Sequence, residues 1–171
     1  MRAVKNRITA SLGTFAFFWI APATVAGWLP WYFTRWRIAA PLFDGIASRW
    51  LGALLLLAGA AIVIECFARF ALKGIGTPAP VAPTQHLVVS GLYRHFRNPM
   101  YVGVVTAILG QALLFGSPVL VGYAAVVFAG FFLFVLGYEE PALRRQFGAE
   151  YEAYCRNVPR WIPRIRPWSG A

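Results

Sequence analysis

The side chains best suited to chemistry lie in residues 90–101, which read S-G-L-Y-R-H-F-R-N-P-M-Y and sit between two long apolar stretches. Arginine, histidine and an Asn-Pro pair are costly to place in hydrocarbon, so such a run beside membrane helices indicates a place that holds a polar ligand. A second polar cluster, Glu139-Glu140, follows the last apolar stretch. Together the two clusters predict a polar pocket under an apolar roof.

The composition predicts an integral membrane protein. Hydrophobic residues make up 59% of the chain and charged residues only 13%, whereas soluble domains carry about a quarter charged residues. A spanning helix needs about 20 apolar residues. We therefore expect an all-α membrane fold, in one domain of residues 1–171, with four transmembrane helices. Their approximate bounds are residues 10–33, 49–72, 99–115 and 118–138.

The third and fourth of these segments are joined by the short turn Gly116-Ser117, which predicts a helical hairpin. A hairpin brings the start of its first helix to the end of its second, so residues 85–101 and Glu139-Glu140 should face each other. Asn98-Pro99 is a helix-start signal, since Asn caps helices and Pro suits the first helical position. The loop of residues 73–98 begins with a proline-rich, extended part and continues into a strand-like piece, residues 87–89.

The net charge of +10 reflects membrane orientation rather than nucleic-acid binding, because the basic residues flank the apolar segments. With the N-terminus inside, only Arg35, Arg37 and Arg49 of the sixteen Lys and Arg residues lie outside. The positive-inside rule then places both termini, the loop of residues 73–98 and the tail of residues 139–171 in the cytoplasm. In a bacterium the membrane would be the inner one.

Two cysteines, Cys66 and Cys155, and two histidines, His86 and His95, lack the spacing of metal ligands, so no metal site is expected. The basic N-terminus and the small residues before Gly27 resemble a signal peptide. The apolar run continues beyond that point, so we expect the segment to be retained as a membrane helix.

After Pro141, the residues Leu143, Phe147, Tyr151 and Tyr154 recur at helical spacing. They predict an amphipathic cytoplasmic helix that lies on the membrane or on the loop, with this stripe serving for packing. The following arginine- and tryptophan-containing tail has the composition of an interfacial anchor.

Several polar residues have two readings. Glu65 is either a substrate contact or base, or an i,i+4 partner of Arg69. Arg97 positions a ligand or binds lipid phosphate. Glu139-Glu140 has the stronger functional reading, because negative charge is unfavourable at a helix C-terminus.

These motifs resemble a known family. Residues 97–103 read R-N-P-M-Y-V-G, and the glutamate pair opens the pattern E-E-x-x-L-x-x-x-F-G-x-x-Y. Over residues 75–165 the chain resembles the integral membrane methyltransferases, namely the isoprenylcysteine carboxyl methyltransferases and the phospholipid N-methyltransferases. The resemblance implies methyl transfer from S-adenosylmethionine, with S-adenosylhomocysteine as product, to a lipid or prenyl-type acceptor at the cytoplasmic face.

The candidate catalytic residues are Glu140 and Arg97, and the candidate substrate contacts are Glu65 and Val135. The resemblance also implies which residues contact the cofactor. The cofactor contacts would be Gln85, His86, Leu87, Val88, Tyr93, Asn98, Pro99, Met100, Tyr101 and Glu139.

Two positions depart from the family pattern. The prenylcysteine enzymes carry an arginine one turn before the glutamate pair, where this chain has Val135, which argues against a free-carboxylate prenylcysteine as acceptor. The histidine of the R-H-P form is Asn98 here. The sequence leaves O- and N-methylation open, and it leaves a second class open: a non-catalytic membrane-binding or scaffold protein that retains the fold.

Overall fold

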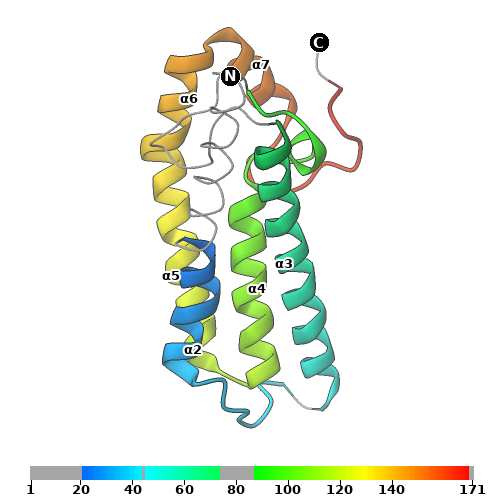
Figure 1. The fold of residues 1–171 in the computed structure, drawn as a ribbon, viewed down its shortest axis with the longest axis vertical. Coiled ribbons are helices and arrows are strands. Elements are labelled where there is room, and N and C mark those ends of the chain that lie inside the picture. Colours follow the sequence, from blue (N-terminus) through cyan, green and yellow to red (C-terminus); the bar gives the residue numbers. More distant parts are fainter. Residues whose placement is uncertain (1–20, 44, 74–86, 170–171) are drawn as a thin grey trace, which may run out of the picture. The chain divides into compact units, whose positions relative to one another are not determined.

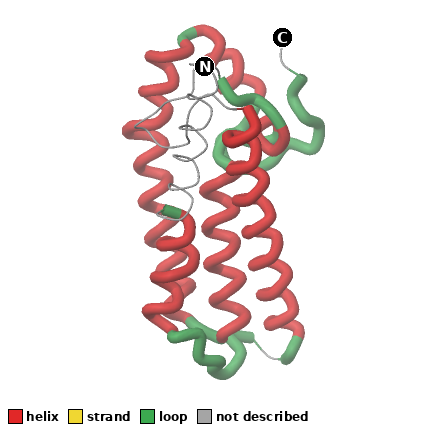
Figure 2. Tube along the Cα trace, in the orientation of Figure 1, coloured by secondary structure: helices red, strands yellow, loops and turns green. Residues whose placement is uncertain are grey.

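A computed structural model describes residues 21–43, 45–73 and 87–169 of the chain (Figure 1). This described part is helical, with loops and no strand (Figure 2). Its elements, in chain order, are η1 (Thr24–Trp28), α2 (Leu29–Thr34), α3 (Ala47–Lys73), η2 (Gly91–Arg94), α4 (Pro99–Phe115), α5 (Pro118–Phe134), η3 (Val135–Glu139), α6 (Glu140–Phe147) and α7 (Ala149–Asn157).

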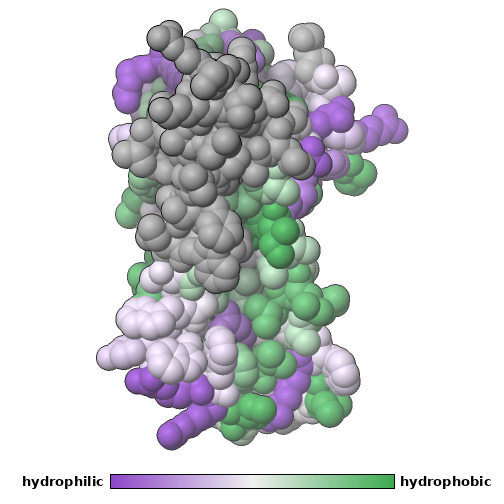
Figure 3. Space-filling model, viewed as in Figure 1, coloured by the Kyte–Doolittle hydropathy of each residue, from purple (hydrophilic) through white to green (hydrophobic). Residues whose placement is uncertain are grey.

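Among the described residues, two helical stretches are long and apolar enough to cross a membrane, Ala47–Arg69 and Pro118–Phe147. Helix α4 is apolar but shorter, and it begins and ends where the Asn-Pro and Gly-Ser signals predict. Of the first predicted segment, residues 10–20 lie outside the described residues. Large hydrophobic side chains are exposed on the long helices, such as Leu57, Val126 and Leu133, and Figure 3 shows exposed hydrophobic groups in green on one face.

The described residues divide into two compact units. The helical unit comprises residues 21–63 and 100–132, apart from residue 44. The pocket unit comprises residues 64–73, 87–99 and 133–169.

In the helical unit, facing glycines bring α3 and α4 into close backbone contact. A Cβ atom placed on Gly59 would lie 2.6 Å from the Gly103 carbonyl oxygen and 2.5 Å from the Ala107 nitrogen. One at Gly52 would lie 2.8 Å from the Gly110 carbonyl oxygen. The two glycines of each helix are seven residues apart and pair in opposite order, so the helices run antiparallel. Small residues are the usual means by which membrane helices approach this closely.

The same unit joins α5 to α4 and α2. Gly116, at φ +68°, forms the turn after α4, and the rings of Tyr101 and Phe131 lie 4.5 Å apart. The Tyr123 hydroxyl donates to the Val25 carbonyl oxygen at 2.9 Å, and the Gln111 amide donates to the Ala26 carbonyl oxygen at 2.7 Å. These bonds fix α2 and the preceding turn against the longer helices.

Both described π-helical turns come just before a proline. η1 precedes Pro30 in the helical unit, and η3 precedes Pro141 in the pocket unit. Proline lacks an N–H and its ring clashes with the carbonyl one turn back. A wider turn relieves that clash, since it accommodates one additional residue. The helix therefore continues through Pro30.

The glycine contact predicts opposite outcomes for two matched substitutions. Gly59→Ala should destabilise the protein by about 2 kcal/mol, since the added methyl group overlaps the α4 backbone. Gly130→Ala, on α5 where a Cβ atom would meet nothing within 4 Å, should instead stabilise it by up to about 1 kcal/mol through helix propensity. Thermal unfolding in detergent measures both, and equal shifts for the two variants would contradict the close α3–α4 contact.

Candidate functional site

A pocket lies in the pocket unit, among the residues singled out from the sequence. It encloses about 510 Å³ of empty space, part of it open to solvent. The lining comes from the loop before η2, from η2, from the residues before α4, from η3 and from helices α6 and α7. The lining residues are Leu87, Val88, Tyr93, Arg97, Asn98, Val135, Glu139, Glu140, Leu143, Tyr151 and Tyr154.

The η3 turn explains how two adjacent glutamates reach one pocket. Val135, Glu139 and Glu140 all line it, and the Glu140 N–H bonds to the Val135 carbonyl oxygen in the i→i−5 pattern of a π-helix. Because this turn holds one more residue than an α-helical turn, it brings all three side chains to the same side. π turns of this kind are frequent at functional sites.

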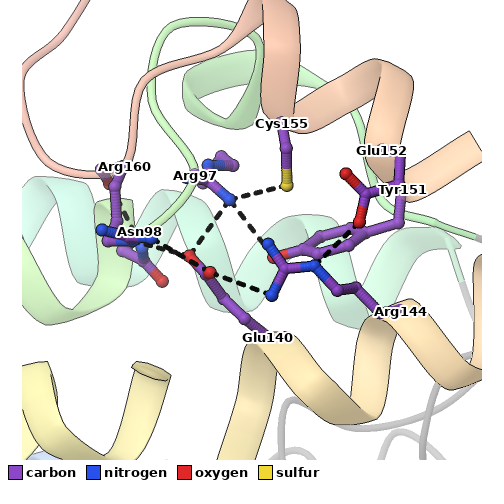
Figure 4. Close-up of polar contacts among 8 residues, drawn as sticks. All are labelled: Arg97, Asn98, Glu140, Arg144, Tyr151, Glu152, Cys155 and Arg160. Carbon is purple, nitrogen blue, oxygen red and sulfur yellow. Dashed lines mark hydrogen bonds and ion pairs between the residues drawn. The ribbon is translucent and has the colours of Figure 1, made fainter. Parts of the chain in front are cut away.

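Glu140 lies at the centre of a group of three arginines (Figure 4). Its side chain is 3% exposed, and Arg160 binds both of its oxygens, with Nε 2.6 Å from Oε1 and Nη2 3.1 Å from Oε2. Arg97 Nη1 lies 3.1 Å from Oε1, and Arg144 Nη1 lies 3.5 Å from Oε2. The hydrogen bond to Glu140 raises the pKa of Arg160. One carboxylate thus joins the segment before α4, helix α6 and the tail.

Arg97 has spare hydrogen-bonding capacity inside the pocket unit. Its side chain is 10% exposed, and Nη1 donates to Cys155 Sγ at 2.7 Å. Its Nε is buried and has no hydrogen-bond partner in the described structure. An unsatisfied buried donor is costly, so a pocket ligand with an acceptor group would find a site here.

Asn98 also bonds to the tail, since its amide nitrogen donates to the Arg160 carbonyl oxygen at 3.1 Å. The two neighbouring residues before α4 therefore contact both partners of the Arg160–Glu140 ion pair. This linkage sets the position of the helix start, and it uses the amide function that distinguishes Asn from the histidine of the related pattern.

Three tyrosine hydroxyl groups add a neutral, hydrogen-bonding part to the lining. Burial raises the pKa of Tyr93 well above its ordinary value, and the nearby Cys66 and Glu139 add to this effect. Burial likewise raises the pKa of Tyr151 and of Tyr154. These phenols therefore stay protonated at neutral pH. The Tyr154 hydroxyl donates to the Tyr93 carbonyl oxygen at 2.6 Å, which fixes η2 against α7.

Glu65 pairs with Arg69 one helical turn away, as one of its two sequence readings predicted. It does not line the pocket. Gly91, at φ +56°, lies directly against this ion pair, because a Cβ atom there would collide with both side chains. The second oxygen of Glu65 is buried without a hydrogen-bond partner in the described part of the chain.

The structure brings together eight of the residues named from the sequence. Leu87, Val88, Tyr93, Arg97, Asn98, Val135, Glu139 and Glu140 line the pocket. Pro99 is buried in the same unit, whereas Met100 and Tyr101 belong to the helical unit. Gln85 and His86 lie outside the described residues.

Sequence reasoning missed part of the lining. The stripe assigned to packing does pack, with Tyr151, Tyr154 and Val158 in a buried cluster that also contacts Leu87 and Val89 of the loop. Leu143 and the two tyrosines line the pocket in addition. Arg160 is also missed as a partner of Glu140. Its position directly after Val158-Pro159 is a usable signal, because proline restricts the backbone and so limits where the following arginine can reach.

Comparison with known proteins places the chain in a family. The phospholipid methyltransferase family model matches residues 47–150, more than half of the chain, so the chain belongs to this family. It is 32% identical to the human protein-S-isoprenylcysteine O-methyltransferase over 175 residues and 33% identical to the rat protein of the same name over 174 residues. Each match covers 96% of this chain and 59% of the relative.

A fission yeast protein-S-isoprenylcysteine O-methyltransferase is 38% identical over 79 residues, covering 46% of this chain and 34% of that protein. The chain thus spans about three-fifths of the length of its human and rat relatives. No solved structure matched the chain.

The central carboxylate predicts a large stability difference between two glutamate substitutions. Glu140→Ala should destabilise the protein by about 3 kcal/mol, because it leaves the buried Arg97 guanidinium without its counter-charge. Glu152→Ala removes only an exposed ion pair with Arg144 and should cost less than about 1 kcal/mol. Denaturant unfolding in detergent compares them. Similar losses would mean that Glu140 does not hold the pocket together.

Proposed function

We propose that the protein transfers a methyl group from S-adenosylmethionine to a lipophilic acceptor at the cytoplasmic face of a membrane. The pocket of the pocket unit carries this proposal. Its lining combines the apolar loop residues Leu87 and Val88, a buried phenol, an unsatisfied Arg97 Nε and the two carboxylates of η3 and α6. Family membership and the names of the relatives support the same reaction class.

The lining residues suit the parts of such a cofactor, which supplies a methyl group on a cationic sulfur. The backbone of Leu87 and Val88 would bind the adenine edge, because an extended segment offers both N–H and C=O groups. The aromatic face of Tyr93 would hold the cationic centre. Glu139 would accept from its ammonium or ribose hydroxyl groups. The cofactor carboxylate would bind at the start of α4, formed by Asn98, Pro99 and Met100, where free N–H groups favour anions.

Gln85 and His86 precede this extended segment directly in the chain, and we propose that they extend the same cofactor contact. Glu65, whose second carboxylate oxygen is buried without a partner among the described residues, is proposed to contact the substrate. Val135 would form an apolar part of the acceptor site.

Methyl transfer is an in-line displacement, so the chain mainly has to align the two reactants and exclude water. We propose that Arg97 contacts a reactant through Nε. Glu140 has both oxygens engaged by guanidinium groups. A carboxylate in that state is poorly placed to take a proton, so its proposed part in catalysis is to position Arg97 and Arg160.

We further propose that four spans, with α4 and α5 as a hairpin, place both termini and residues 73–98 and 139–171 on the cytoplasmic side. The Lys and Arg distribution supports this orientation. The acceptor is proposed to be a lipid or prenyl-type molecule, since the relatives are named for isoprenylcysteine and the family for phospholipids. Both O- and N-methylation are consistent with these names.

Ligand binding tests the cofactor assignment. Millimolar S-adenosylhomocysteine should raise the unfolding temperature of the purified protein, because a ligand that binds only the folded state stabilises it. Glu139→Ala should weaken this shift, while Glu150→Ala, an exposed position on α7 outside the pocket, should retain it. If the wild-type protein shows no shift, the cofactor site is wrong, and the non-catalytic scaffold or membrane-binding alternative replaces it.

Product analysis tests the reaction. With methyl-labelled S-adenosylmethionine and a lipid extract, the wild-type protein should transfer label into the organic phase. Release of the label by mild base would identify a methyl ester, and retention would identify an N-methyl product. A protein that binds S-adenosylhomocysteine but transfers no label to any lipid fraction would contradict methyl transfer to a lipophilic acceptor.

A further inference from the structure

We propose that residues 161–166 of the tail dock on the surface of an anionic bilayer. The segment belongs to a longer stretch, residues 159–168, which we call the tail strap. The inference goes beyond methyl transfer and rests on three observations within the pocket unit: how the strap is fixed, what it exposes and what charge it carries.

Backbone hydrogen bonds fix the strap to the segment before α4. The N–H groups of Arg164 and Trp168 donate to the carbonyl oxygens of His95 and Arg94, each at 3.0 Å. Arg94 Nε donates in turn to the Trp168 carbonyl oxygen at 2.6 Å. At the other end, the Arg97 N–H donates to the Pro159 carbonyl oxygen at 2.9 Å. The strap therefore has a defined conformation along its length.

Held in this way, the strap presents two isoleucines outward. Ile162 is 78% exposed and Ile165 is 96% exposed. Both lie between the fixed points at Pro159 and Trp168, so they cannot turn inward without breaking the bonds at Arg164 or Trp168. Trp168 itself is used internally, since its ring stacks on Tyr154 at 5.8 Å. Exposed isoleucines on a fixed backbone indicate an external apolar partner.

The charge of the segment specifies that partner. Residues 153–171 contain Arg156, Arg160, Arg164 and Arg166 and no acidic residue. Arg160 is paired with Glu140, whereas Arg166 is exposed beside Ile165. Isoleucines that alternate with arginines, next to a tryptophan, match the interface of a bilayer that carries anionic lipids. Two helical stretches of the described residues are also long and apolar enough to cross a membrane.

An environment-sensitive fluorophore tests the docking. A genetically encoded dansyl amino acid replaces Ile165, or Glu150 on α7 as the exposed control, in the full-length protein, which leaves both cysteines in place. Each variant is reconstituted in nanodiscs of phosphatidylcholine alone or with about a third phosphatidylglycerol. Thermal unfolding verifies that both variants fold.

At position 165 the emission should shift to shorter wavelength relative to position 150, and nitroxide-labelled lipid should quench it. Phosphatidylglycerol should increase both effects, and Arg166→Glu should reverse the increase. Equal, water-like emission at the two positions in both lipid compositions would overturn the proposal. A shift at position 165 that ignores phosphatidylglycerol and Arg166→Glu would overturn the anionic part of it.

Discussion

The pocket unit depends on one interaction, the binding of three arginines by the Glu140 carboxylate. Arg97 comes from the segment before α4, Arg144 from α6 and Arg160 from the strap. These segments are far apart in sequence, and a single side chain joins them. At 3% exposure, the carboxylate has left much of its water, a cost that only multiple close contacts offset. The four side chains of this polar cluster therefore depend on one another, and loss of one contact should weaken the others.

The η3 turn makes this arrangement compatible with a second carboxylate at the same pocket. In a regular α-helix, residue 139 would lie about 40° around the helix axis from residue 135 and residue 140 about 140°, so Glu140 would turn away from the side that Val135 faces. The π turn places both beside Val135. Glu140 can then hold the arginines while Glu139 is proposed to bind the ligand. Pro141, which removes a backbone donor just after the turn, supplies the local reason for its formation.

The sequence predicts the described helices better than the contacts between their side chains. The Asn98-Pro99 and Gly116-Ser117 signals place the ends of α4 correctly, because capping is local. The polar residues of the pocket are recognisable because charge is rare in an apolar chain. Each π turn has only five residues, which is too few to give a recognisable periodicity in the sequence. Two further features depend on which segments of the chain meet: the glycine contact between α3 and α4, and the ion pair of Arg160 with Glu140. Neither hydropathy nor helix propensity specifies which segments meet.

Val135 is best understood from the pocket as a whole. Taken alone, valine in place of the family's arginine argues against an anionic acceptor. In the structure this residue is fully buried and lines the same pocket as Arg97, whose Nε has no partner among the described residues. The segment before α4 thus contributes positive charge to the pocket lining through Arg97. At Val135, η3 contributes an apolar surface instead. A lining that is apolar at Val135, Leu87 and Leu143, and polar at Arg97 and Glu139, suits a ligand with one end of each kind. The proposed amphiphilic acceptor, beside the proposed cofactor, would meet that requirement.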